Sequence, residues 1–77
     1  MTQAQWSRKF AEKVRKHMAY NGYSQRDLAR LAKIPENTIS RYLSGERIPR
    51  ADQCINIAKA LNCSVMELIQ FGEMVTK

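Results

Sequence analysis

Four polar side chains between residues 35 and 44 are of types that form hydrogen bonds with the edges of DNA bases. They are Glu36, Asn37, Ser40 and Arg41, at positions i, i+1, i+4 and i+5, which fall on one side of an α-helix. An asparagine amide pairs with adenine through both polar atoms, a guanidinium forks onto guanine, and a carboxylate accepts from the cytosine amino group. This stretch is therefore a candidate surface for recognition of double-stranded DNA.

The charge of the chain also favours an anionic partner. Its 77 residues carry a formal net charge of +6. Residues 1–50 hold 11 Lys and Arg against 4 Asp and Glu, whereas residues 51–77 hold 2 against 3. A basic region of this kind is typical of proteins that bind nucleic acid or another anionic surface. The net charge alone is equally consistent with a surface that only keeps the protein soluble. The residue pattern must therefore distinguish the two interpretations.

The residue types needed for catalysis or metal binding do not form a recognisable pattern. A chain of 77 residues has little room for a deep active site, and its three isolated glycines give no phosphate-binding loop. Cys54, Cys63 and the single histidine, His17, cannot supply the four ligands of a zinc site. We therefore expect no cofactor and no enzymatic activity, and free thiols that pack in the core.

The location of the protein is also predicted from the sequence. No apolar run is long enough to cross a membrane, and the first residues contain no apolar segment typical of a secretion signal. We expect a cytoplasmic protein with no membrane partner.

Helical periodicity and helix-ending residues divide the chain into five short helices. The predicted helices cover residues 2–20, 24–33, 35–44, 51–61 and 65–71. Their predicted capping pairs are Thr2 with Gln5, Ser24 with Asp27, and Ser64 with Glu67. The residues expected to face inward from the second to fourth helices are Leu28, Leu31, Ala32, Ile39, Tyr42, Leu43, Cys54, Ile55, Ala58 and Leu61. No segment alternates with a period of two, so we predict one all-α domain over residues 1–77.

Residues 23–50 contain a helix-turn-helix pattern that resembles the phage-repressor family of the Cro/CI type, also called the XRE type. The matching residues are Ser24-Gln25, Leu28-Ala29, Ala32, Ile34, Thr38-Ile39-Ser40-Arg41, Gly45 and Pro49. Residues 57–68 are similar to the last two helices of that family, so the resemblance extends over about residues 7–70. It implies a compact five-helix, lambda-repressor-like fold, with the helix-turn-helix at about residues 24–44.

The resemblance implies a role for each matched position. Gln25, at the start of the second helix, would contact a DNA phosphate and brace the recognition helix. The residues expected to face bases are Glu36, Asn37, Ser40 and Arg41. Those expected to meet the DNA backbone are Thr38, Arg47 and Arg50. The Thr38 methyl group is also suited to contact the methyl group of thymine.

Two positions depart from the family pattern. Lys33 occupies the turn position that is usually glycine, so we expect a left-handed backbone there and a lysine kept for a phosphate contact. Glu36 places a carboxylate where the family commonly has an uncharged or basic side chain. Phosphates repel a carboxylate, so Glu36 either reads cytosine or pairs with Arg41 or another side chain. The sequence leaves these alternatives open.

The C-terminal segment, residues 65–77, is a candidate dimerisation surface. Its apolar residues include Met66, Ile69, Phe71 and Met74, which a domain of this size does not easily bury in full. The alternative is that they complete the core. A two-fold dimer would place its recognition helices about 34 Å apart, so its operator would be an imperfect inverted repeat.

The residues and the resemblance together predict a sequence-specific DNA-binding transcriptional regulator, a repressor of phage or mobile-element type that acts as a homodimer. No small-molecule ligand is evident. Two alternatives remain: a helix-turn-helix used as a protein-interaction module, such as an antitoxin or anti-regulator, and the controller protein of a restriction–modification system.

Overall fold

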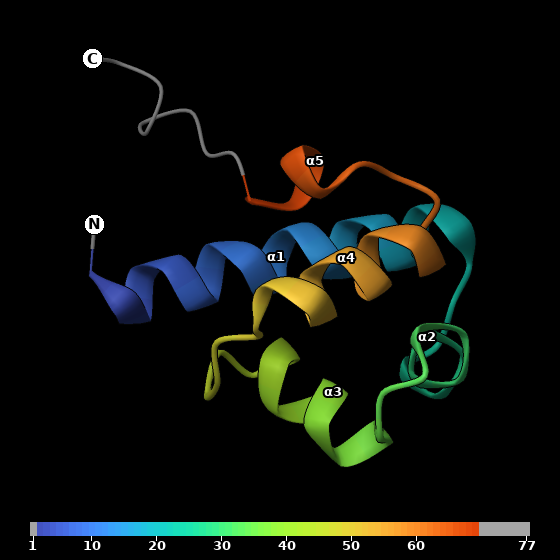
Figure 1. The fold of residues 1–77 in the computed structure, drawn as a ribbon, viewed down its shortest axis with the longest axis horizontal. Helices are drawn as coiled ribbons and strands as arrows, with labels where there is room; N and C mark the ends of the chain where they lie inside the picture. The colour runs from blue at the N-terminus through green and yellow to red at the C-terminus, as the bar shows by residue number, and fades with distance from the viewer. Residues whose placement is uncertain (1, 70–77) are drawn as a thin grey trace.

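The computed structural model describes residues 2–69 of the chain, and five α-helices account for most of them (Figure 1). They are α1 (Gln3–Asn21), α2 (Gln25–Ala32), α3 (Glu36–Leu43), α4 (Ala51–Ala60) and α5 (Val65–Ile69). Within residues 2–69 no strand is present, which confirms the predicted all-α fold. The observed helices begin or end within one or two residues of their predicted bounds, and the description of α5 stops at Ile69.

The predicted capping pairs set the starts of three helices. Thr2 with Gln5 and Ser24 with Asp27 form capping boxes before α1 and α2. Before α5, the backbone N–H of Ser64 donates to Glu67 Oε2 at 3.0 Å, and the N–H of Glu67 donates to Ser64 Oγ at 3.3 Å. Each pair satisfies backbone donors that the first turn of a helix leaves unpaired. Short local signals therefore define where these helices begin.

One small core is shared by all five helices. Its most completely buried large side chains are Phe10, Val14, Leu28, Ile39, Ile57, Leu61 and Leu68. Trp6 stacks on Phe10 with ring centroids 5.3 Å apart and extends the core toward the start of α1. Asn21 ties two helix ends together, because its Nδ2 donates to the carbonyl oxygens of His17 and Leu61 at 2.9 and 3.0 Å. No helix could bury its apolar face without the others.

Two of the predicted inward-facing residues are exposed. Leu31 and Ile55 each keep 43% of their surface accessible, whereas Ile57 is 1% exposed. Both predictions were wrong for the same reason. The buried stripe of each helix is narrow, and helical periodicity alone does not show whether a neighbouring helix covers an apolar residue at the edge of that stripe. The other inward-facing residues predicted for α2, α3 and α4 are buried.

Figure 1 shows α3 and α5 on opposite sides of α1 and α4. Helix α3 lies at the edge of the molecule, with α2 beside its first turn. None of the helices that the structure describes is long and apolar enough to span a membrane.

Candidate nucleic-acid interface

A tight turn of three residues joins α2 to α3. Lys33 ends α2 in the left-handed conformation, with φ 60° and ψ 42°, as its place at a glycine position predicts. The backbone N–H groups of Lys33 and Ile34 both donate hydrogen bonds to the carbonyl oxygen of Ala29. Ile34 is 4% exposed and anchors the turn in the core, and Pro35 directly precedes α3. The angle between the two helices is therefore fixed by a short, well-anchored connection.

Helix α3 presents a polar face to solvent because its apolar face is held in the core. Ile39, Tyr42 and Leu43 are 1%, 4% and 6% exposed. The residues on the outer side, all exposed, are Glu36, Asn37, Ser40 and Arg41. Thr38 is half-buried between the two faces. The four base-reading candidates thus lie together on one accessible surface, as the i, i+1, i+4, i+5 spacing predicts.

The remaining predicted contact residues lie at the start of α2, in the turn before α3 and in the loop between α3 and α4. Gln25 is the half-buried first residue of α2, and its backbone N–H is among those that a helix N-terminus leaves free for an anion. Lys33 lies in the turn, and Arg47 and Arg50 lie in the loop after α3; all three are exposed. Arg50 pairs with Asp52 at 3.3 Å, with both side chains largely in solvent.

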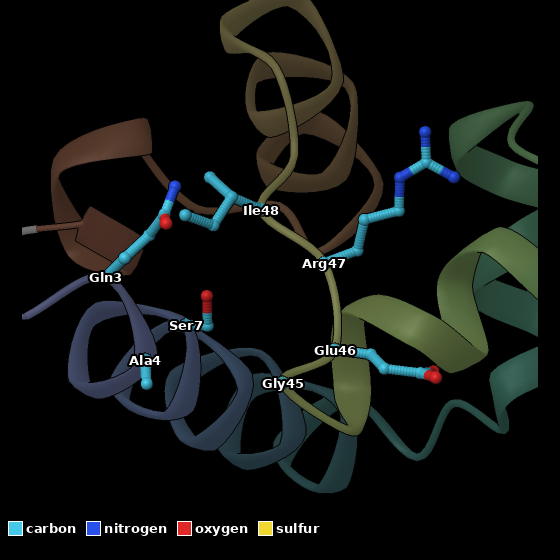
Figure 2. Close-up of a pocket in the computed structure, with 7 residues that line it drawn as sticks. All are labelled: Gln3, Ala4, Ser7, Gly45, Glu46, Arg47 and Ile48. Carbon is cyan, nitrogen blue, oxygen red and sulfur yellow. The ribbon is translucent and has the colours of Figure 1, made fainter.

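The start of the loop of residues 45–50 faces the first turns of α1 across a groove. Gly45 follows Ser44, the C-cap of α3, with φ +79°, where an L side chain would be strained. Figure 2 shows that Ile48 extends toward Gln3, whereas Arg47 extends from the other side of the loop. A groove of about 480 Å³ separates the loop from Gln3, Ala4 and Ser7. Arg47 is also among the residues that line this groove, and it is exposed overall.

The electrostatics of the loop agree with this placement. Tyr42 is buried on the inner side of α3, and burial raises the pKa of its hydroxyl group, while the positive charges of Arg47 and Arg50 act in the opposite direction. Lys33 precedes α3 and Arg47 follows it in the chain, so an exposed cation lies in the connection on each side of α3.

Sequence reasoning missed one residue of this surface, Arg26. Its Nε lies 3.8 Å from Glu36 Oε1, so the structure pairs Glu36 with α2 rather than with Arg41 on its own helix. The two residues are ten positions apart, and only the angle between α2 and α3 brings them together. The periodicity of residues within one helix gives no information about a contact between two helices.

The described part of the chain forms no candidate metal site, and its two cysteine thiols are not activated. Residues 2–69 contain no group of three or more His, Cys, Asp and Glu side chains that could hold a metal ion. Cys54 is buried and Cys63 half-buried, both as free thiols, which agrees with the prediction. Burial raises the pKa of both thiols and so disfavours the reactive thiolate at neutral pH.

The candidate dimerisation residues lie in or after α5. Met66 is 55% exposed, whereas Ile69 is half-buried and packs against the core. Phe71 and Met74 lie outside the described residues. The nine predicted DNA-contacting residues thus belong to α2, α3, the turn between them and the loop after α3, and both their DNA contacts and the dimer surface stay predictions.

The comparisons with known proteins agree with this geometry. Residues 14–68 match a protein-family model described as helix-turn-helix. The fold is similar to the crystal structure of the restriction–modification controller protein C.AhdI from Aeromonas hydrophila, with a TM-score of 0.78 and 26% sequence identity, over 80% of this chain and 94% of that one. The comparison with curated proteins found no match. The chain belongs to the Cro/CI-type helix-turn-helix family of DNA-binding transcription regulators.

Proposed function

We propose that this protein regulates transcription by reading a specific double-stranded DNA sequence, with α3 lying in the major groove. The observation that carries the proposal is the outward face of α3, on which Glu36, Asn37, Ser40 and Arg41 are all exposed. An α-helix fits the major groove, where each base pair presents a distinct pattern of donors and acceptors. Asn37 suits adenine, and Arg41 suits guanine.

The flanking residues would hold α3 in register on the DNA. The expected phosphate contacts are Gln25 at the start of α2, Lys33 in the turn, Thr38 on α3, and Arg47 and Arg50 in the loop after α3. Contacts with phosphates position a protein without reading sequence, and they release counterions. Binding should therefore weaken steeply as the salt concentration rises.

A homodimer formed through α5 would double the reading surface. Exposed Met66 and half-buried Ile69 belong to α5, on the side of the molecule away from α3, so a contact there leaves the reading face uncovered (Figure 1). Residues 51–77 carry a net charge of −1, from 2 Lys and Arg against 3 Asp and Glu, which removes an electrostatic barrier to self-association. The operator would then be an inverted repeat with half-sites ~10 bp apart.

Two kinds of regulator fit this mechanism. The first is a repressor of phage or mobile-element type, which would block the polymerase by occupying its operator. The second is a restriction–modification controller, and the similarity to C.AhdI over 94% of that protein favours it. Both would read DNA in the same way, and the genes next to the operator would distinguish them.

The test is selection from a random pool of double-stranded DNA at ~0.15 M salt, with the Asn37→Ala/Arg41→Ala variant run in parallel. Enrichment of an inverted repeat that the variant fails to select would support a dimeric sequence reader. A single half-site would support the reader and contradict the dimer. No enrichment, with helicity intact by circular dichroism, would contradict the proposal and favour a protein-interaction module.

A further inference from the structure

An ion pair joins the first turn of α2 to the first turn of α3. Arg26 is the second residue of α2, Glu36 is the first residue of α3, and Arg26 Nε lies 3.8 Å from Glu36 Oε1. Their side chains are 84% and 50% exposed. Exposed ion pairs contribute little to stability, because water screens them and holding two long side chains in place costs entropy. The fold therefore does not need this pair, and both side chains remain accessible to a ligand.

A carboxylate at Glu36 needs a neighbouring cation when DNA is bound. The α3 N-terminus carries a partial positive charge that stabilises Glu36, but a phosphate backbone approaching the same helix end repels it. The Arg26 guanidinium offsets that negative charge. It also has five N–H donors in a planar fork, so it can hold the carboxylate and retain donors for the DNA.

We propose that Arg26 is a positioning residue for Glu36, and that the two together select a cytosine at one position of each half-site. The inference rests on the proposed function of α3 as the base-reading helix. Glu36 would accept a hydrogen bond from the cytosine amino group while Arg26 holds its carboxylate in place. Thymine presents an acceptor oxygen at the corresponding position, which repels a carboxylate. Held by Arg26, the Glu36 carboxylate would therefore discriminate between cytosine and thymine.

The chain offers a matched control on the same helix. Arg30 lies one turn after Arg26 and is also exposed, but its Nη2 pairs with Asp27 Oδ1 at 3.3 Å within α2 and not with α3. Arg26→Ala and Arg30→Ala remove the same charge from the same helix. Only the first removes the partner of Glu36.

The test measures Kd for every single-base-pair variant of the operator obtained by selection. Glu36→Gln should lose the preference for cytosine at one position, by roughly 5- to 150-fold for a good base contact. Arg26→Ala should lose most of the same preference, and Arg26→Ala/Glu36→Gln should lose no more than Glu36→Gln alone. Arg26→Lys should restore part of the preference, and Arg30→Ala should leave it intact. Thermal melting should change little for any of these exposed substitutions.

The inference is overturned if Arg26→Ala weakens binding by one factor on all DNA while the cytosine preference remains. In that case Arg26 is a plain phosphate contact. An operator whose reading does not depend on Glu36 also overturns the inference, while the proposed function stands. A wild-type protein that selects no DNA contradicts the proposed function itself, so the two failures are distinguishable.

Discussion

The guanidinium of Arg15 donates a hydrogen bond of 2.8 Å to the carbonyl oxygen of Leu43, and so links the middle of α1 to the last residue of α3. The last carbonyls of a helix have no partner within it and carry a partial negative charge. Arg15 therefore supplies both a donor and a positive charge to the C-terminal end of α3. The long first helix thus helps to hold α3, and the polar face proposed to read DNA, in place.

Removing this contact should destabilise the fold. Arg15→Ala leaves a partly buried carbonyl without its charged donor, so we expect the free energy of unfolding to fall by about 1–2 kcal/mol. Urea denaturation monitored by circular dichroism measures the change. Lys16→Ala removes one positive charge from the adjacent exposed position and serves as the control. Equal stability of the two variants would show that the Arg15 hydrogen bond contributes nothing beyond surface charge.

Lys33→Gly should stabilise the protein. Lys33 has φ 60°, a conformation that costs a non-glycine residue roughly 1–2 kcal/mol, while a glycine loses roughly 0.5–1 kcal/mol more backbone entropy on folding. We therefore expect a net gain of about 0.5–1 kcal/mol in urea denaturation. The same variant should bind DNA more weakly, because the predicted phosphate contact of Lys33 is lost. Lys33→Ala removes the same charge and keeps the strain, so an equal gain from alanine would contradict this explanation.

The stability of the fold should fall in acid because of its capping carboxylates. Hydrogen bonds from Ser24 lower the pKa of Asp27 below its ordinary 3.8, and those from Ser64 lower the pKa of Glu67 below its ordinary 4.5. A lowered pKa in the folded state stabilises the fold above the ordinary value, and this stabilisation is lost as the pH falls through the lowered one. The melting temperature should therefore drop below about pH 4. This drop should be smaller in Asp27→Asn/Glu67→Gln than in the wild type, and an equal drop would contradict this explanation.

A charge at Met66 should break the proposed dimer. Met66 is 55% exposed on α5, and burying a carboxylate in an apolar interface is unfavourable. Met66→Asp should be monomeric in sedimentation velocity and should bind a full operator no better than a half-site. Tyr20→Asp changes another exposed large side chain, at the end of α1, and should leave the association state unchanged. A dimer that survives Met66→Asp would place the interface elsewhere.

The sequence predicted those parts of the molecule that depend on local signals. Capping pairs such as Ser24 with Asp27 mark helix starts, and the spacing of Asn37 and Arg41 identifies the outer face of α3, because both depend only on neighbouring residues. The left-handed backbone at Lys33 followed from its place at a glycine position of the family pattern. These signals require no knowledge of how the helices pack.

The sequence did not predict what depends on how the helices pack. The choice between Ile55 and Ile57 as the buried residue of α4 depends on which side its neighbours cover. The pairing of Arg26 with Glu36 depends on the angle at the turn, since α2 and α3 are short and the two side chains lie on different helices. The angles between helices arise from packing of the whole core and cannot be derived from one periodic pattern.

The central claim, that α3 reads bases, is tested most directly at Arg41. The measurement is Kd for the operator and all of its single-base-pair variants, with the wild type, Arg41→Ala and the predicted phosphate contact Arg50→Ala. Arg41→Ala should lose about 1–3 kcal/mol of binding free energy and its preference at one position of each half-site, whereas Arg50→Ala should weaken binding to all variants equally. An equal loss on every sequence for Arg41→Ala, or no loss at all, would contradict base reading by this residue of α3.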